Sequence, residues 1–234
     1  MNSYSASPIT IQIIENAKAF GASLAGITSV ASLKNSPSHK VGRKLRWPGG
    51  VKSVLVLALH HKTSEPKLDW WDNKEGGTAG NRQMIRTAAS LRQWLKEEFN
   101  INAQPLPYHV ERGGIFLKDA AALARLGAIG KNNLLITPQF GPRVRLRALF
   151  MDVELEPAGP IDFAPCEGCD MPCRRVCPEK AFASGPYVKA LCNEQMKKDE
   201  ANKVVFKEVD NDHSPSMLVK YCRTCELSCP VARQ

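Results

Sequence analysis

All eight cysteines of this 234-residue chain lie between Cys166 and Cys229, and the first 165 residues contain none. A disulfide framework would normally be spread through a much smaller secreted chain. Residues 1–8 show no basic stretch followed by an apolar segment, so we expect no secretory signal and a cytoplasmic protein. Clustered cysteines in such a chain predict metal ligands rather than disulfides.

The cysteines form two groups with an isolated cysteine, Cys192, between them. The first group reads C-x2-C-x3-C-x3-C-P from Cys166 to Pro178, and the second reads C-x2-C-x3-C-P from Cys222 to Pro230. Bacterial ferredoxins use C-x2-C-x2-C-x3-C-P, in which the fourth cysteine ligates the other cluster. A [4Fe–4S] cube needs four thiolates. A short loop supplies three of them, and the fourth must arrive from a distant segment.

This exchange of the last cysteine divides the eight residues into two quartets. We predict that the first quartet, which holds one [4Fe–4S] cluster, is Cys166, Cys169, Cys173 and Cys229. The second quartet, which holds the other cluster, is then Cys177, Cys192, Cys222 and Cys225. Zinc is the alternative, because four-cysteine zinc knuckles also use C-x2-C. Zinc ribbons, however, use paired C-x2-C loops rather than a run of four cysteines within twelve residues.

The composition limits the partners. The formal net charge is +9, and two clusters bound by eight thiolates would lower it to about +5, so the basic character is moderate. Hydrophobic residues make up 43% of the chain, which is enough for a full core. The longest apolar run, Val54–Leu59, is far shorter than the roughly 20 residues of a membrane span. We therefore expect a folded protein that does not interact with a membrane.

Residues 1–160 alternate between helical and strand patterns. Apolar residues at helical spacing predict helices over residues 8–21, 82–99 and 115–126. Apolar runs predict strands over residues 53–59, 134–136 and 144–155, while residues 34–50 and 62–80 are expected to be loops. Such alternation is typical of a layered α/β or α+β domain, and prolines near residues 157–165 mark its end. We predict an α+β fold with one domain over residues 1–160 and a cysteine-rich domain over residues 161–234.

The segment Arg125–Ile136, RLGAIGKNNLLI, resembles the AGLGWIGKNxLLI motif of epoxyqueuosine reductases. GPRVRL follows at residues 141–146, and the two cysteine groups with the isolated Cys192 keep the order of that family. Reductive dehalogenases share this core, so the chain resembles a clan of cobalamin-dependent iron–sulfur reductases. The resemblance implies a nitroreductase-like α/β sandwich that binds a base-off corrinoid, followed by a ferredoxin-like domain whose two [4Fe–4S] clusters deliver electrons to the cobalt.

The resemblance also suggests cofactor-binding residues. Gly127, Gly130, Lys131 and Asn132 would form a turn whose backbone approaches the corrinoid, and Arg145 would face its phosphate or an anionic substrate. The structural alternatives are that Gly127 is a helix C-cap and that Arg145 is a solvated residue at a strand end.

A proton donor is expected upstream of the motif. In the family the donor aspartate precedes the second glycine by sixteen residues, a position that corresponds here to Glu111. Tyr108 is a rival donor, because a phenol can also deliver a proton. The alternatives are a surface ion pair between Glu111 and Arg112 and an amphipathic Tyr108 at the edge of the core.

Two departures from the family bear on the substrate. The tryptophan of the motif is Ala128 here, and the sequence stops at Gln234, before the helical-repeat domain that helps full-length epoxyqueuosine reductases to grip tRNA. We expect a short form that reduces a small or nucleoside-type substrate, with tRNA as an alternative and with ferredoxin or flavodoxin as electron donor. The other alternative is an electron-transfer protein, or a reductive activator of a partner corrinoid protein, with no catalytic cofactor of its own.

Overall fold

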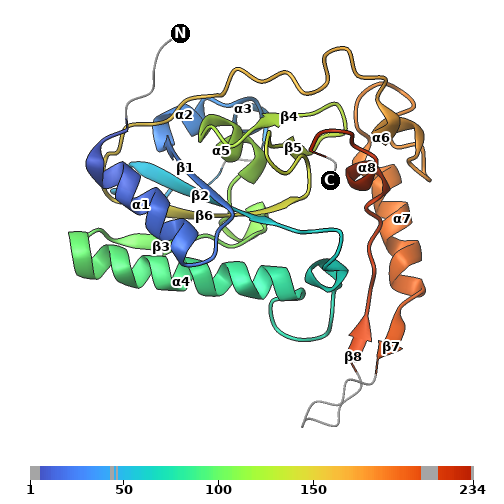
Figure 1. The fold of residues 1–234 in the computed structure, drawn as a ribbon, viewed down its shortest axis with the longest axis horizontal. Helices are drawn as coiled ribbons and strands as arrows, with labels where there is room; N and C mark the ends of the chain where they lie inside the picture. Colours follow the sequence, from blue (N-terminus) through green and yellow to red (C-terminus); the bar gives the residue numbers. More distant parts are fainter. Residues whose placement is uncertain (1–5, 43–44, 46, 207–215, 233–234) are drawn as a thin grey trace.

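The computed structural model describes residues 6–42, 45, 47–206 and 216–232. A four-stranded sheet lies at the centre of residues 6–151, which we call the α/β half (Figure 1). Every neighbouring pair in it is antiparallel. The strand order is β1 (Leu24–Ser29), β2 (Ser53–His60), β6 (Val144–Met151) and β3 (Ala103–Pro105).

Helices cover both faces of this sheet. Leu55 and Leu57 of β2 belong to the core that contains residues of α1 (Pro8–Ala19) and α4 (Ala79–Phe99). The intervening Val54 and Val56 belong to a second core. That core contains residues of α2 (Val30–Lys34) and α5 (Leu117–Leu123). Successive side chains of a strand point to opposite faces, so a continuous apolar run such as β2 requires cover on both sides.

Most elements predicted for this half are confirmed. The three helices are present as α1, α4 and α5, and the three strands as β2, β5 (Leu135–Ile136) and β6. Strand β1 was not predicted, because Gly26 weakens its strand pattern. A Cβ at Gly26 would lie 2.1 Å from the carbonyl oxygen of Ala124, so the close approach of α5 requires glycine there.

The expectation of an unbroken loop over residues 34–50 was wrong. Helix α3 (Pro37–Val41) lies within it, with Ser36 as N-cap and Pro37 in the first turn, where proline is favoured. Residues 43, 44 and 46 lie outside the described residues. The expected loop over residues 62–80 contains one short 3-10 helix, η1 (Pro66–Asp69). Further short elements are η2 (Val110–Arg112) and β4 (Ala128–Ile129), which pairs with β5.

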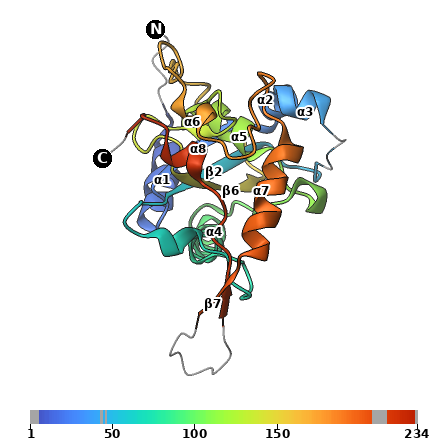
Figure 2. The ribbon, with the colours of Figure 1, turned by 90° about the vertical axis from the view of Figure 1, so that its right-hand side faces the viewer.

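After β6 the chain runs as coil to residues 161–232, which we call the cysteine-rich half. This half contains α6 (Pro172–Arg175), α7 (Lys189–Ala201), β7 (Val204–Phe206), β8 (Ser216–Leu218) and α8 (Thr224–Leu227). Figures 1 and 2 show it against one end of the sheet. The fold is therefore mixed α/β. The division into two domains at residue 160 stays a prediction. In the part of the chain that the structure describes, no helix is long and apolar enough to cross a membrane.

Candidate functional site

The four thiols of the first quartet lie close enough to affect one another's ionisation. Burial raises the pKa of Cys173, and the neighbouring Cys229, Cys166 and Cys169 raise it further. Burial likewise raises the pKa of Cys229, with contributions from Cys166 and Cys169. Cys173 and Cys229 are buried, although 56 positions separate them in the sequence. Helices α6 and α8, which pack on each other, bring these two segments together.

The second quartet is also gathered in space. Burial raises the pKa of Cys225 to about 12, with further contributions from Cys222, Cys192 and Cys177. The Tyr187 phenol is hydrogen-bonded to Cys192, which together with burial raises the pKa of Tyr187. Cys222 is exposed to solvent, so this quartet reaches the surface.

Raised pKa values are expected for buried thiols that lie close together and have no cation to balance their charge. Neighbouring thiolates repel one another, and burial penalises each negative charge, whereas a bound cation reverses both effects. Among the residues described, no three His, Cys, Asp or Glu side chains converge closely enough to hold one metal ion.

A turn of the α/β half contacts the first quartet directly. Residues 130–133, which we call the 130–133 turn, follow β4, and the backbone N–H of Lys131 donates to Cys166 Sγ at 3.3 Å. The next side chain, Asn132, is only 2% exposed. Its Oδ1 accepts from the N–H of Leu134 at 3.2 Å, while its Nδ2 has no partner among the described residues. The structure therefore places Lys131 beside Cys166, and the neighbouring Asn132 has one buried donor without a partner among the described residues.

The two glycines of the motif have a packing explanation. A Cβ at Gly127 would lie 2.1 Å from the carbonyl oxygen of Ile136, and one at Gly130 would lie 2.3 Å from Ile136 Cδ1. The obstacle at Gly127 is backbone of β5, so this position does not tolerate a side chain, whereas the obstacle at Gly130 is the end of the flexible Ile136 side chain, which can move aside. A corrinoid-binding role for Gly127 and Gly130 stays a prediction, and packing against the backbone of β5 already accounts for the glycine at position 127.

Arg145 belongs to a group of charges between the two halves. Its guanidinium lies 2.6 Å from Asp69 Oδ1 and 3.0 Å from Glu226 Oε2, and Arg223 pairs with the same two carboxylates. We call Asp69, Arg145, Arg223 and Glu226 the interface ion cluster. Both carboxylates are buried, and Glu226 directly follows Cys225. The cluster thus ties β6 and η1 to the helix that carries cysteines of the second quartet.

Asp69 is held in its ionised form. Burial alone would raise its pKa, but the hydrogen bond from His61 and the charges of Arg145 and Arg223 outweigh burial and lower it. His61 Nδ1 lies 2.6 Å from Asp69 Oδ1, and the ring is buried. The sequence analysis did not identify Asp69 or Glu226. Asp69 ends the short helix η1 in a stretch expected to be a loop, Glu226 lies beside a cysteine, and no periodic pattern pairs residues 157 positions apart.

The two proposed proton donors differ in their surroundings. Tyr108 is 54% exposed, and its phenol interacts electrostatically with the guanidinium groups of Arg145 and Arg147. Glu111 lies in η2 and is exposed. Arg147 is itself anchored by Asn81 Oδ1, at 2.6 Å, and by the carbonyl of Leu106. The structure therefore brings Tyr108 toward the arginines of β6, whereas Glu111 is exposed in η2.

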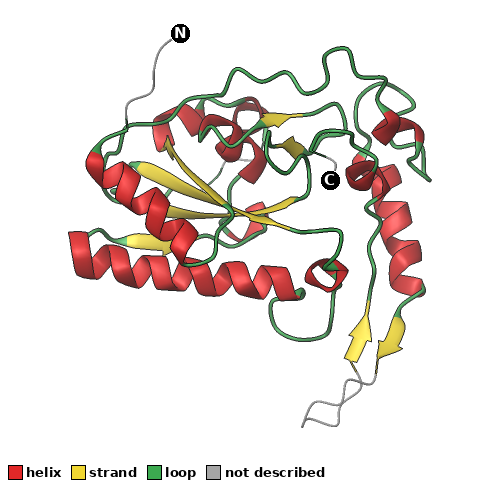
Figure 3. Cartoon of the chain, viewed as in Figure 1, coloured by secondary structure: helices red, strands yellow, loops and turns green. Residues whose placement is uncertain are grey.

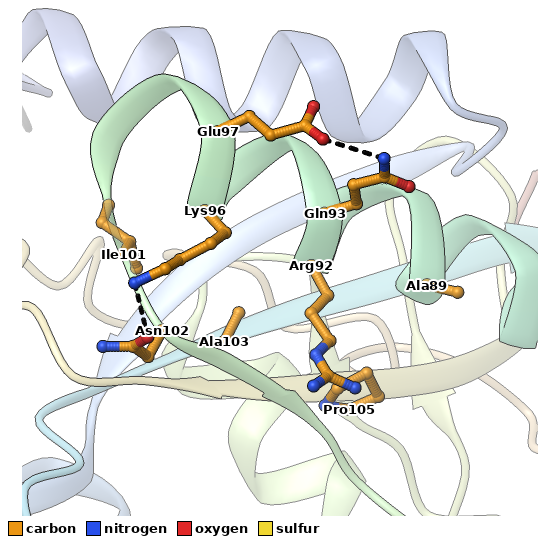
Figure 4. A pocket seen from close by; sticks show the side chains of 9 residues that line it. All are labelled: Ala89, Arg92, Gln93, Lys96, Glu97, Ile101, Asn102, Ala103 and Pro105. Carbon is orange, nitrogen blue, oxygen red and sulfur yellow. Dashed lines mark hydrogen bonds between the residues drawn. The ribbon is translucent and has the colours of Figure 1, made fainter.

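A separate cavity of about 510 Å³ lies between the C-terminal part of α4 and β3 (Figure 4). Hydrogen bonds from Gln93 to Glu97 and from Lys96 to Asn102 cross its rim. None of the site residues predicted from the sequence lines it; the lining residues are Ala89, Arg92, Gln93, Lys96, Glu97, Ile101, Asn102, Ala103 and Pro105.

Proteins similar to this chain in sequence include two kinds of reductase. The tetrachloroethene reductive dehalogenase of Sulfurospirillum multivorans is 44% identical over 68 residues, which are 28% of this chain and 14% of that protein. The epoxyqueuosine reductase of Gloeobacter violaceus is 25% identical over 247 residues, which cover 95% of this chain and 76% of that protein. No protein-family model matches the chain.

Solved structures show the same fold. An epoxyqueuosine reductase crystallised with an epoxyqueuosine-modified tRNA stem loop superposes with a TM-score of 0.64 at 20% identity, over 96% of this chain and 65% of that one. A catabolic reductive dehalogenase in complex with 3-bromo-4-hydroxybenzoic acid gives a TM-score of 0.64 at 17% identity, over 95% and 31%. The chain is thus similar to epoxyqueuosine reductases and reductive dehalogenases, and it spans less than two thirds of both solved chains.

Proposed function

We propose that this protein is an iron–sulfur reductase that passes single electrons through two [4Fe–4S] clusters to a corrinoid. The observation that carries the proposal is the gathering of the eight thiols into two quartets, one of which touches the 130–133 turn. The donor set fits the clusters, because thiolates are the usual ligands of [4Fe–4S] centres. Similarity to two kinds of reductase supports the same reaction class.

The electron path follows from exposure. Cys222 of the second quartet is exposed, so an external low-potential donor such as ferredoxin or flavodoxin would reduce this cluster. The first quartet has two buried cysteines and contacts the α/β half through Lys131. It would therefore receive electrons from the second cluster and pass them toward the 130–133 turn. The clusters are compatible with the reducing cytoplasm, where we place the protein.

A corrinoid would supply low-valent cobalt as the strong reductant. The chain offers it the unpartnered Asn132 Nδ2, beside Lys131, as a buried hydrogen-bond donor for an amide or other acceptor. Tyr108 is the better placed proton donor, because its phenol lies near the guanidinium groups of Arg145 and Arg147 in β6. Glu111 remains the alternative donor, with its carboxyl group at the surface.

We propose a small or nucleoside-type molecule as the substrate. One structural relative was crystallised with a modified tRNA stem loop and another with a brominated hydroxybenzoic acid. Both ligands present a polar or aromatic group that a reductase of this kind would hold near its reductant. tRNA itself is the alternative substrate, and it would be distinguished by comparing the modified nucleoside with the intact stem loop.

The test is anaerobic reconstitution followed by titration with cob(II)alamin. Two clusters correspond to about eight iron and eight sulfide per chain. Binding of the corrinoid should give a base-off cobalt signal in the EPR spectrum. As a matched pair, Cys173→Ser should lose the first cluster and Cys177→Ser the second. A colourless protein with stoichiometric zinc would contradict the proposal as a whole.

An electron-transfer protein without a corrinoid is the second candidate. The observation that favours it is the packing of Gly127 against the carbonyl oxygen of Ile136, which explains this glycine without a cofactor. In that case the reconstituted protein would contain both clusters, reduce and reoxidise fully, and give no cobalt signal after titration with cob(II)alamin.

A further inference from the structure

Backbone N–H groups point at the sulfurs of the first quartet from two directions. Met171 donates to Cys169 at 3.4 Å, and Arg174 and Val231 donate to Cys173 and Cys229; all three donors lie within two residues of the cysteine they contact. The donor to Cys166 is different. It is Lys131, which lies 35 positions away in the α/β half.

The 130–133 turn holds this N–H in place. The carbonyl oxygen of Gly130 accepts from the N–H of Asn133 at 2.9 Å, and the N–H of Gly130 donates to Leu134 at 2.8 Å. The side chain of Lys118 donates to the carbonyl oxygen of Asn133 at 2.6 Å. With Asn132 buried, the turn is fixed on both sides, so its own contacts orient the N–H of Lys131 toward Cys166.

An oriented N–H has a definite effect on an iron–sulfur cluster. One-electron reduction from the 2+ to the 1+ core adds negative charge to the cluster and its thiolates, and no bond or proton is exchanged with the protein. A hydrogen bond to a ligating sulfur stabilises the more negative form, and hydrogen bonds to the sulfurs are among the factors that set cluster potentials. The electron comes from the second cluster, which is oxidised in the same step.

We propose that the backbone N–H of Lys131 raises the reduction potential of the cluster held by the first quartet. The 130–133 turn of the α/β half would thereby stabilise the reduced form of this cluster, which is the end of the electron path nearest to the turn. This inference rests on the proposed function, because it requires a cluster at Cys166. It assigns to the backbone of the turn a tuning role that does not depend on which substrate or corrinoid the protein binds.

The test compares Lys131→Pro with Lys131→Ala in cluster-loaded protein. Lys131 is the second residue of a four-residue turn, a position that favours proline, so proline removes the N–H and keeps the turn. Both variants lose the exposed ammonium group, and only proline also loses the donor. In redox titrations followed by EPR, the first-quartet cluster of Lys131→Pro should have a more negative midpoint potential than that of Lys131→Ala. The second-quartet cluster should have the same potential in both.

Equal first-quartet potentials in the two variants, at equal iron content, would overturn the inference. If Lys131→Pro fails to retain the cluster, the unaltered protein provides the decisive measurement. Protein labelled with ¹⁵N-lysine should show a nitrogen hyperfine coupling to the reduced first-quartet cluster, and labelled Lys131→Ala should lack it. Absence of this coupling from the wild type would overturn the inference. Failure of the wild type to bind iron would instead refute the proposed function.

Discussion

The two halves of this chain are stabilised in different ways. In the α/β half, β2 buries seven of its eight residues between two helical layers. Among the described side chains of the cysteine-rich half, five residues are buried, and two of them are thiols: Cys173, Ala181, Phe182, Glu226 and Cys229. Helix α7, with 13 residues, buries none of them. Figure 3 shows that much of this half is loop.

This difference means that burial of apolar surface stabilises one half, whereas the other needs another source of stability. A segment with so few buried side chains cannot offset the conformational entropy of ordering its backbone. Binding of metal by deprotonated thiols can supply on the order of 10 kcal/mol in small metal-dependent domains. The clusters would therefore be structural as well as electron-carrying.

Removal of the iron should have the largest effect. Anaerobic treatment with a chelator and an oxidant should unfold the cysteine-rich half, while β2 and β6 keep their structure because their core contains no thiol. In hydrogen exchange, amides of α7 and α8 should lose protection and those of the sheet should keep it.

Reconstitution with iron and sulfide should restore the lost protection, which controls for irreversible damage. If the amides of α7 and α8 stay protected without iron, packing alone orders this half, and it does not need bound metal for its stability.

Truncation of a core side chain should lower the unfolding free energy through the α/β half. Leu57→Ala removes a fully buried side chain between the sheet and helices α1 and α4, which should cost about 2–5 kcal/mol of unfolding free energy. Urea unfolding followed by far-UV circular dichroism measures this loss. The exposed Val205→Ala in β7 is the matched control and should change the free energy by no more than about 0.5 kcal/mol. Equal losses in the two variants would contradict a core confined to the α/β half.

The interface ion cluster should couple the halves with a smaller effect. Arg145→Met leaves the buried carboxylates of Asp69 and Glu226 with one cation fewer, and breaking a buried pair typically costs 3–5 kcal/mol. The Arg145 side chain is 32% exposed, so solvent screening should reduce the loss in unfolding free energy to about 2 kcal/mol.

Two comparisons sharpen this prediction. Arg175→Met breaks an ion pair with Asp170 that is exposed on both sides, and it should cost at most about 1 kcal/mol. In a double-mutant cycle, Arg145→Met and Glu226→Gln should be non-additive, because each removes the same contact. Additive free energies would show that Arg145 and Glu226 do not stabilise the junction together.

The periodic parts of the α/β half could be predicted from the sequence, and the tertiary contacts could not. Apolar runs led directly to β2 and β6, because strands covered on both faces have a strong pattern. Strand β3 has three residues, and β1 contains a glycine required by packing against Ala124, so neither produces such a pattern.

The candidate site shows the same limit. Cysteine spacing predicted which thiols would be gathered in space, because a short loop can supply only three ligands to a cluster and a distant segment must supply the fourth. The role of these thiols as ligands stays a prediction. The pairing of Arg145 with Asp69 and Glu226 depends on how two distant segments pack, and charge patterns over short windows contain no information about that.

The smallest effect concerns pH and is confined to the α/β half. Asp119 accepts hydrogen bonds from the hydroxyl groups of Ser36 and Ser38, at 2.7 and 2.8 Å, and from the N–H of Ser38. Burial alone would raise its pKa, but the hydrogen bonds from His39, Ser36 and Ser38 lower it to about 2. Because the folded pKa is below the unfolded value, this carboxylate stabilises the fold fully above about pH 4, and the contribution disappears as the pH falls toward 2.

The stability difference between wild type and Asp119→Asn should therefore shrink by up to about 2 kcal/mol between pH 5 and pH 2. Urea titrations followed by tryptophan fluorescence measure these stabilities, and one of the four tryptophans, Trp47, has its ring 5.7 Å from that of His39. The exposed Glu154→Gln is the control, and its difference from wild type should stay nearly constant. Loss of iron in acid affects all three proteins alike, so it cancels in these differences. If the difference in unfolding free energy between wild type and Asp119→Asn does not depend on pH, Asp119 stabilises α3 through its shape and hydrogen bonds rather than through its charge.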